Sequence, residues 1–192
     1  MHRIDAILLA SGFSRRFQNG NKLLHNLKGR PLASYTLELV SSLPFFRIHF
    51  VAANREVLRL AEAYPKSPIM VQFNSNPARG QCESIRLGVE ASSAEYYMFF
   101  VCDQPLLDQK TVNAVIEKAA PGKIVHPTFE GQPKMPSLFS NAFRNELLAL
   151  ADGENARSIK KRHPNALIEV PIKTKTPLQD VDTLQDFDIL PN

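Results

Sequence analysis

The sequence predicts an α/β protein whose mostly parallel sheet is covered by helices on both faces. Three observations support this fold class: apolar runs of strand length recur along the chain, segments with helical periodicity lie between them, and the strand runs are apolar at successive positions instead of alternating. Strands and helices that follow one another in this way form a three-layer domain. Ligand sites in such domains lie at the carboxyl ends of the strands.

Six apolar, β-branched or aromatic runs are expected to form strands. They are Ile4 to Ala10, Arg47 to Ala53, Ile69 to Phe73, Tyr96 to Cys102, Lys123 to His126, and Leu167 to Ile172. Helical spacing of apolar residues follows Pro31, Asn54 and Asp108. Asn54 and Asp108 are expected N-caps, because their side-chain oxygens can accept hydrogen bonds from the free amides of a first helical turn.

The pattern becomes irregular beyond His126. Four breakers predict a loop or short hairpin there: Pro127, Gly131, Pro133 and Pro136. We expect this part of the chain to form one wall of a ligand cleft.

Composition limits the class of protein. The 192 residues contain no glycine- or serine-rich linker, so we expect one domain, residues 1–192. The most apolar runs are only of strand length and Met1 to Asp5 is polar, which predicts neither a membrane span nor a secretory leader. Cys82 and Cys102 have no metal or redox spacing and are expected to be reduced thiols of a cytoplasmic protein.

Charge gives a weaker indication of the partner. The formal net charge is +4, but the Lys and Arg residues are scattered and form no stripe with interleaved aromatic residues. We therefore expect no nucleic-acid partner. Polyphosphate substrates explain a mild basic excess equally well.

The segment from Ile7 to Lys22 begins as a strand and becomes small, polar and basic. Small residues let backbone amides approach a phosphate chain, and Arg and Lys supply countercharge. The segment matches neither a Walker loop nor a dinucleotide turn. Its residues alone are compatible with a phosphate site or with a solvated basic loop.

Asp103 directly follows an apolar strand run, so its side chain is expected at the carboxyl edge of the sheet. A carboxylate there could hold Mg²⁺, which is bound in proteins by one or two carboxylates together with substrate phosphates. An aspartate that caps a helix or a turn is the ordinary alternative.

The first segment resembles the signature L-A-[AG]-G-x-S-x-R-M-G-x-x-x-K of the molybdopterin nucleotidyltransferases, a MobA-like NTP transferase family that includes molybdenum cofactor cytidylyltransferases. The resemblance implies that the loop wraps a nucleoside triphosphate, with Arg16 and Lys22 on its phosphates and the backbone near Ala10 and Ser11 facing the base. The implied nucleotide contacts in this loop are Leu9, Ala10, Ser11, Gly12, Ser14, Arg16 and Lys22. Phe17 replaces a Met of the family, and Gln18 replaces a Gly, where a positive φ would be strained.

Two carboxylate segments also resemble the family. Phe100 to Leu106 is similar to its x-D-[MQ]-P signature, which implies that Asp103 binds the metal and, with Arg16 and Lys22, serves catalysis. Asp180 to Phe187 is similar to D-I-D-T-P-E-D-L, which implies Asp182 as the second metal ligand. Asp186 is expected on the last helix in a structural role.

Asn76 to Gly88 resembles the family segment N-x-x-x-G-x-x-x-S-[LI]-x-x-G. The resemblance implies nucleotide contacts from Asn76, Gly80 and Ser84, with base and ribose contacts from the last two. Arg86 is a weaker candidate, because an exposed arginine on a helix is common.

The acceptor side departs further from the family. Lys134 and Met135 replace the Gly-His of G-x-x-G-H-P-x-L-F, so any role of that His is absent here. Asn155 replaces the second Gly of G-D-x-G-A-R and is expected to allow a left-handed turn. Lys160, Lys161, Arg162 and His163 could contact an anionic acceptor, but cations are also favoured at a helix C-terminus, and we prefer that interpretation.

Together these resemblances imply a Rossmann-like three-layer α/β/α sandwich with a mostly parallel mixed sheet, of the nucleotide-diphospho-sugar transferase type. They also imply Mg²⁺-dependent transfer of CMP from CTP to molybdopterin with release of pyrophosphate. Family members that use GTP typically have Ala-Gly-Gly in the first loop and those that use CTP have Ala-Ala-Gly, so the small side chain of Ser11 at the deciding position favours CTP over GTP.

Two other functions stay open. One is CTP- or GTP-dependent transfer to another phosphorylated acceptor, such as a sugar or polyol phosphate. The other is an inactive binding or chaperone protein that hands a cofactor to a molybdoenzyme.

Overall fold

The computed structural model describes residues 2–12, 14, 17, 20–64 and 69–188. Its strands are β1 Ile4–Ala10, β2 Asn26–Leu27, β3 Arg30–Pro31, β4 Arg47–Ala52, β5 Ile69–Phe73, β6 Tyr96–Val101, β7 Ile124–Phe129, β8 Gln132–Pro133, β9 Ser137–Ser140 and β10 Leu167–Pro171. Its α-helices are α1 Ala33–Ser41, α2 Arg55–Glu62, α3 Gln81–Glu90, α4 Gln109–Ile116, α5 Arg144–Leu148, α6 Ala156–Arg162 and α7 Leu184–Asp188. Two short 3₁₀ helices, η1 Lys22–Leu24 and η2 Pro77–Arg79, lie beside the functional region described below.

The described residues form a mixed, mostly parallel sheet of eight strands in the order β10-β7-β9-β6-β1-β4-β5, with β8 paired to β7. Strand β9 is antiparallel to both β6 and β7, and β8 is antiparallel to β7. The remaining pairs of this sheet are parallel. A separate hairpin joins β2 and β3.

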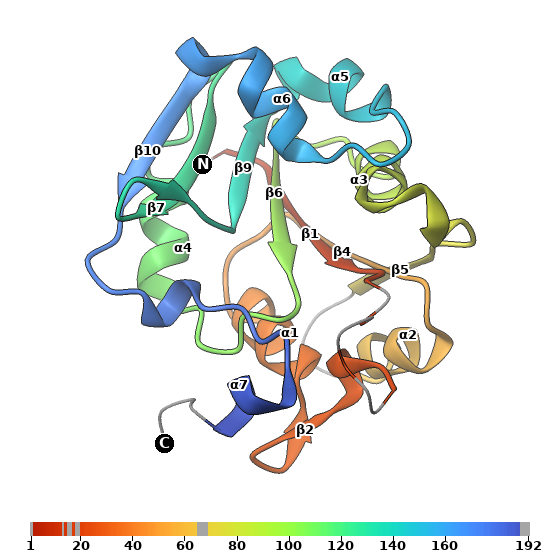
Figure 1. Ribbon diagram of the computed structural model, residues 1–192. Coiled ribbons are helices and arrows are strands. Elements are labelled where there is room, and N and C mark those ends of the chain that lie inside the picture. Colours follow the sequence, from red (N-terminus) through yellow and green to blue (C-terminus); the bar gives the residue numbers. More distant parts are fainter. Residues whose placement is uncertain (1, 13, 15–16, 18–19, 65–68, 189–192) are drawn as a thin grey trace.

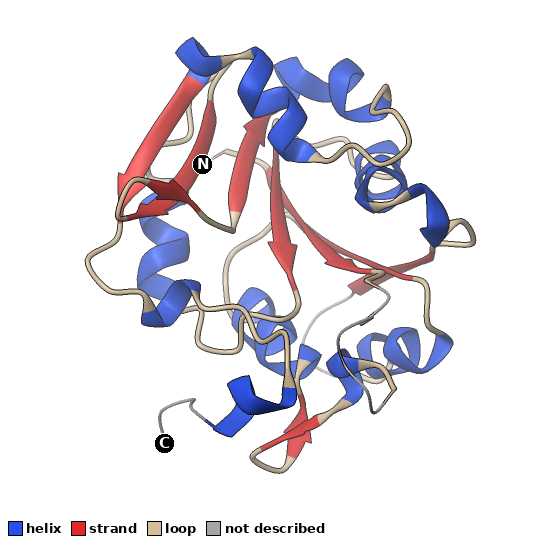
Figure 2. Cartoon of the chain, in the orientation of Figure 1, coloured by secondary structure: helices blue, strands red, loops and turns tan. Residues whose placement is uncertain are grey.

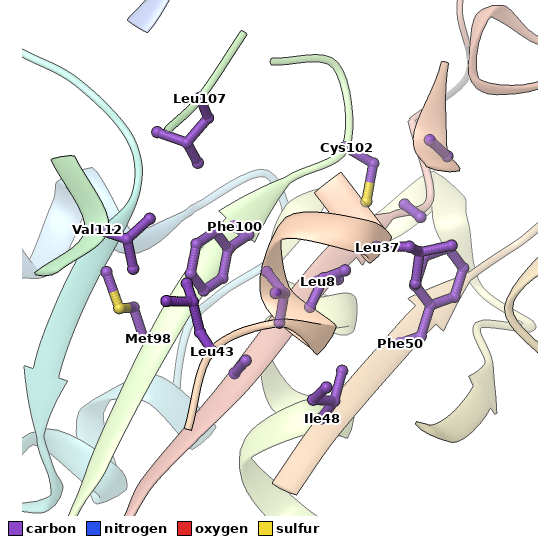
Figure 3. Packing of buried hydrophobic residues seen from close by; sticks show 14 of the residues in the cluster. Leu8, Leu37, Leu43, Ile48, Phe50, Met98, Phe100, Cys102, Leu107 and Val112 are labelled. Atoms are coloured by element: carbon purple, nitrogen blue, oxygen red, sulfur yellow. The ribbon is translucent and has the colours of Figure 1, made fainter. Parts of the chain in front are cut away.

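Helices cover both faces of the sheet, as Figures 1 and 2 show. One face packs on α1, α2 and α4 and includes Leu8, Phe50 and Phe100; Figure 3 shows the part of this core where Leu37 of α1 and Val112 of α4 meet the strands. The other face packs on α3, α5 and α6. Each strand of the centre therefore buries both of its faces, which explains its continuous apolar sequence.

The predicted α/β/α class and all six predicted strands are confirmed, with boundaries that differ by a few residues. Strand β7 is longer than predicted and continues through Pro127, whose carbonyl accepts a hydrogen bond from the amide of Lys134 at 2.9 Å. Proline interrupts a strand only where its missing N–H is needed for the ladder. The predicted hairpin is present as β7 and β8, whereas β9 was not predicted, because its four residues directly follow Pro136 in a segment with several breakers.

The predicted helix caps have mixed outcomes. Asn54 accepts from the amides of Glu56 and Val57, and Asp108 accepts from the amide of Thr111, so both predicted N-caps are confirmed. The left-handed turn predicted at Asn155 is wrong, since this residue has an extended backbone with φ −152°. Its side chain instead accepts from the amide of Arg157 and caps α6, a role for which Asn is among the best residues.

Across the described residues, no helix has the length and apolar character needed to cross a membrane.

Helix α3 lies close to the centre of the sheet, and Gly88 makes this approach possible. A Cβ at Gly88 would lie 2.4 Å from Cγ2 of Ile7 in β1. Ile7 is fully buried, so it has little room to move. The absence of a side chain at Gly88 therefore allows the short distance between α3 and β1.

We expect Gly88→Ala to destabilise the protein by about 1–3 kcal/mol, although alanine has the higher helix propensity, because overpacking at Ile7 outweighs the gain of about 1 kcal/mol. Urea unfolding would measure the change. Glu90→Ala, at an exposed position of the same helix, is the control and should have little effect. A Gly88→Ala variant as stable as the wild type would contradict this account of the packing.

Candidate active site

A pocket of about 270 Å³ opens at the carboxyl ends of β1 and β6 and at the N-terminus of α3. It is lined by Leu9, Ser11, Gly12, Ser14, Lys22, Leu23, Pro77, Gly80, Gln81, Ser84, Val101, Cys102 and Asp103. Most of these residues come from three segments that are far apart in the chain. The pocket lies where a doubly covered α/β sheet is expected to bind a ligand.

Lys22 connects two carboxylates at this edge of the sheet. Its Nζ donates to Oδ2 of Asp103 at 2.7 Å, to Oδ1 of Asp182 at 3.0 Å and to the carbonyl of Val181 at 3.0 Å. Burial lowers the pKa of Lys22, but the two carboxylates outweigh this effect and leave the pKa raised. Lys22 is therefore a stable ammonium ion that holds Asp103 and Asp182 close together.

The segment that carries Asp182 is attached to the end of β6 through its backbone. The amide of Val181 donates to the carbonyl of Asp103 at 2.8 Å, and Nε2 of Gln104 donates to Oδ1 of Asp180 at 2.8 Å. Burial and the charge of Asp103 raise the pKa of Asp180. The C-terminal segment thus brings further negative charge to the end of β6.

Asp186 stabilises the start of α7, as its predicted structural role requires. Its Oδ2 accepts from the amides of Asp182 and Thr183 at 2.8 and 2.7 Å. Burial opposes ionisation, but these amides hold the pKa of Asp186 below its ordinary value. Asp186 therefore fixes the backbone of Asp182 without entering the pocket.

The first loop is held in place by local bonds and by aromatic contacts. Ser14 has a positive φ of 49°, and its Oγ accepts from the amide of Lys22 at 3.1 Å. The ring of Phe17 packs against His25 and Phe187, with centroids 5.0 and 5.9 Å away. Phe187 belongs to α7, so the loop contacts the C-terminal segment through aromatic rings as well as through Lys22.

The N-terminus of α3 forms the opposite wall of the pocket. Gly80 has a φ of +93°, a conformation that side chains other than glycine rarely adopt, and a Cβ there would contact the backbone of Gly153 at 3.4 Å. Oγ of Ser84 accepts from Nδ2 of the buried Asn74 at 3.0 Å, which fixes its hydroxyl. Free amides at a helix start can bind a ligand that carries oxygen acceptors.

The carboxylates are suited to a divalent metal. Oδ1 of Asp103 is buried and has no hydrogen-bond partner in the described part of the chain, although the other oxygen is bound by Lys22. An uncommitted carboxylate oxygen is the kind of ligand that hard cations prefer. The described residues contain no cluster of three or more His, Cys, Asp or Glu that could hold a metal by themselves. A metal bound here would therefore need phosphate or water oxygens in addition.

The structure brings together most of the residues predicted for the site. Leu9, Ser11, Gly12, Ser14, Lys22, Gly80, Ser84 and Asp103 all line the pocket. Asp182 reaches it through Lys22, whereas Ala10 is buried in β1 and Asn76 is exposed at the start of η2. Arg16 and Gln18 lie outside the described residues.

Five lining residues were not predicted: Leu23, Pro77, Gln81, Val101 and Cys102. Val101 and Cys102 directly precede Asp103. Their position at the carboxyl end of a predicted strand could have indicated that they line the pocket. Arg86 does not line the pocket but forms an ion pair with Glu83, as an ordinary helix arginine would. Cys82 and Cys102 are buried free thiols, and burial raises the pKa of Cys102.

A second polar cluster lies on the same face of the sheet, between β7, β9 and α6. Nζ of Lys160 donates to Oγ of Ser137 at 2.7 Å, and His126 is fully buried with no partner for either ring nitrogen within the described residues. Burial and the charge of Lys160 lower the pKa of His126 to about 4. Lys160 thus differs from the other cations at the end of α6, since Arg162 and His163 form ion pairs with Glu146 at the surface.

Fold and site together define a nucleotidyltransferase-type α/β domain. Residues 6–167 match the model of the MobA-like NTP transferase domain. The chain belongs to this family.

Relatives support the same assignment. The molybdenum cofactor guanylyltransferase of Shewanella putrefaciens is 26% identical over 134 residues, which are 68% of this chain and 66% of the relative. A nucleotidyl transferase from Methanothermobacter thermautotroptrophicus has a TM-score of 0.82 at 19% identity and covers 96% of this chain and 94% of its own. Rv0371c of Mycobacterium tuberculosis, solved as a complex with manganese, has a TM-score of 0.79 at 20% identity and covers 98% of this chain and 97% of its own.

The chain matches only part of some curated relatives. It spans just under two thirds, 66%, of the Shewanella putrefaciens protein and 25% of the bifunctional protein GlmU of Thermodesulfovibrio yellowstonii, to which it is 27% identical over 115 residues. The structural neighbours are below 25% identity and establish the fold alone.

We expect Lys22→Met to destabilise the protein by about 1–3 kcal/mol, because two partly buried carboxylates would lose their shared countercharge. Added Mg²⁺ should raise the melting temperature of this variant more than that of the wild type, since the metal can replace the lost positive charge. Differential scanning calorimetry with and without Mg²⁺ would measure both effects.

Lys110→Met, at an exposed position of α4, is the matched control and should alter neither quantity. Equal Mg²⁺ responses in Lys22→Met and the wild type would argue against a metal at these carboxylates.

The buried His126 predicts a loss of stability in acid. Its pKa is about 4 in the folded protein and near 6.5 in an unfolded chain, so only the unfolded state binds the proton between these values. The stabilising contribution is complete above pH 6.5 and is lost as the pH falls towards 4, by up to about 3 kcal/mol. His126→Leu should show a shallower fall in urea-unfolding free energy than the wild type over this range. Parallel curves, after alignment at pH 8, would show that His126 does not cause the loss.

Proposed function

We propose that this chain is a Mg²⁺-dependent nucleotidyltransferase that transfers CMP from CTP to molybdopterin and releases pyrophosphate. The observation that carries the proposal is the convergence of Lys22, Asp103 and Asp182 at the end of a pocket in a MobA-like fold. Phosphoryl transfer depends mainly on positioning and on neutralisation of charge, and these residues can supply both.

Asp103 and Asp182 are the proposed metal ligands. When bound there, Mg²⁺ would neutralise phosphate charge and act as a Lewis acid. The uncommitted Oδ1 of Asp103 supports the assignment, as does the manganese complex of the structural neighbour. Mg²⁺ is proposed over other divalent ions because it is typically bound by a few carboxylates with substrate phosphates.

Lys22 and Arg16 are the proposed cations for the triphosphate. An oxygen of the acceptor phosphate would attack the α-phosphorus in line, forming one P–O bond as the bond to pyrophosphate breaks. Lys22 would stabilise the negative charge of this transition state. The acceptor phosphate is already ionised, so no general base is required.

The proposed nucleotide contacts are Leu9, Ala10, Ser11, Gly12, Ser14, Asn76, Gly80 and Ser84, together with Arg16 and Lys22. CTP is favoured by Ser11, which lines the pocket and whose Oγ donates to the carbonyl of Val51 at 3.3 Å.

GTP is the alternative donor, and a specific observation favours it. Curated relatives with 25–26% identity are named molybdenum cofactor guanylyltransferases. Those names also support molybdopterin as the acceptor, and a molybdoenzyme is the proposed later recipient of the product. Two buried free thiols and a mild basic charge agree with a cytoplasmic protein that handles phosphates.

We expect Mg²⁺-dependent release of pyrophosphate with molybdopterin and CTP at a rate at least about tenfold above that with GTP, ATP or UTP. Asp103→Asn should reduce the rate by about 10²-fold or more, because it removes a charged ligand of the metal. A coupled pyrophosphate assay across the four nucleotides would measure both. Circular dichroism of Asp103→Asn would verify that the fold is intact.

Three other results would redirect the assignment. Faster turnover with GTP would select a guanylyltransferase. Turnover with a sugar or polyol phosphate but not with molybdopterin would replace the acceptor. Nucleotide binding without turnover under any condition would indicate a binding or chaperone protein.

A further inference from the structure

The cluster of His126, Ser137 and Lys160 lacks a negative charge. Lys160 is only 9% exposed and forms no ion pair with any residue that the structure describes. The charged neighbour that perturbs it, Arg157, is also positive and, after burial, lowers the pKa of Lys160 to about 8. A buried ammonium ion without a carboxylate is costly in a folded protein unless something compensates it.

His126 adds two unused hydrogen-bonding groups to this cluster. Both of its ring nitrogens are buried without a partner in the described chain, although buried polar groups are nearly always satisfied. The hydroxyl of Ser137 is occupied, since it accepts from Lys160 and donates to Sδ of Met135 at 3.3 Å. The unmet capacity therefore lies on Lys160 and His126, and an anion with oxygen acceptors would accept from the ammonium of Lys160 and from the single N–H of the neutral His126 ring.

Sheet register relates the cluster to the pocket. Ser137 is paired with Phe99 of β6, and the β7–β9 register continues to place His126 beside Ser137. Two residues further along β6, Val101 lines the pocket on the same face of the sheet. His126 is two strands away from β6, which corresponds to about 10 Å across the sheet.

This separation means that the cluster and Asp103 cannot bind the same phosphate. In the proposed function, the attacking phosphate of the acceptor lies beside Asp103. A group held at Lys160 must therefore belong to another part of the acceptor. Met135 precedes Ser137 in the chain, and its thioether accepts a hydrogen bond from the hydroxyl of Ser137.

We propose that Lys160 and His126 form a subsite for a second anionic group of the acceptor, at least about 10 Å from its reacting phosphate, since Asp103 also lies beyond Phe99 along the direction of β6. This inference rests on the proposed function and deepens it. The acceptor would be a molecule with negative charge at both ends. Simple monophosphates of sugars and polyols would fill only the first position and would be poor acceptors.

The binding test uses inorganic phosphate as the probe and the full chain without nucleotide. Titration should shift the ¹⁵N resonances of the His126 ring in a saturable manner. Lys160→Met should weaken this response about tenfold or more, the effect expected for loss of one charged hydrogen bond. Lys160→Arg, which keeps the charge, should retain most of it.

Lys161→Met is the matched control, because it removes an exposed positive charge from the same helix. It should leave the titration unchanged. If Lys160→Met does not fold, Lys160→Gln removes the charge but keeps a donor and serves in its place. No saturable shift at His126, or an equal shift in the charge-removing variant, would overturn the proposal.

Kinetics give a second readout for an active enzyme. Lys160→Met should raise KM for the acceptor about tenfold while KM for the nucleotide stays nearly constant. An unchanged acceptor KM would count against the subsite. If no nucleotide and acceptor pair turns over, the proposed function fails, but the phosphate titration still decides whether the subsite exists.

Discussion

The ammonium group of Lys22 is the interaction on which the site depends. It joins the first loop to the end of β6 and to the C-terminal segment. Asp103 at the end of β6 is 81 residues from Lys22 in sequence, and Asp182 in the C-terminal segment is 160 residues away. Without a cation between them, Asp103 and Asp182 would repel each other at the edge of the sheet. In the proposed function, a divalent metal would use the same pair of carboxylates and would carry the charge to replace the lysine. The ion pairs that stabilise this region would then also prepare it for a metal and phosphates.

The mixed sheet separates two regions of one face. Strand β9 runs antiparallel between β6 and β7, so the pocket at β1 and β6 lies two strand spacings from His126 on β7. Helix α3 covers the first region and α6 covers the second. A ligand that spans both must be long.

Departures from the family pattern are met by local substitutes. Asn155 stands where the family has glycine, yet the chain begins α6 with a side-chain cap in an extended conformation. Met135 stands where the family has His, and its sulfur accepts from Ser137. The side-chain chemistry at both positions therefore differs from that of the family pattern.

The sequence by itself determined the fold class, six strands and two helix caps, and its resemblance to the family indicated the first-loop and Asp103 parts of the pocket. The fold features follow from hydrophobic periodicity and short polar caps and the pocket residues from the order of the motifs, all of which are local along the chain. Tertiary structure alone decided that Lys22 lies between Asp103 and Asp182, that Asn76 remains exposed, and that Lys160 turns inward towards Ser137 while its neighbours stay at the surface. Those outcomes depend on contacts between segments far apart in sequence, where register and burial, and not local preference, decide which charged groups meet.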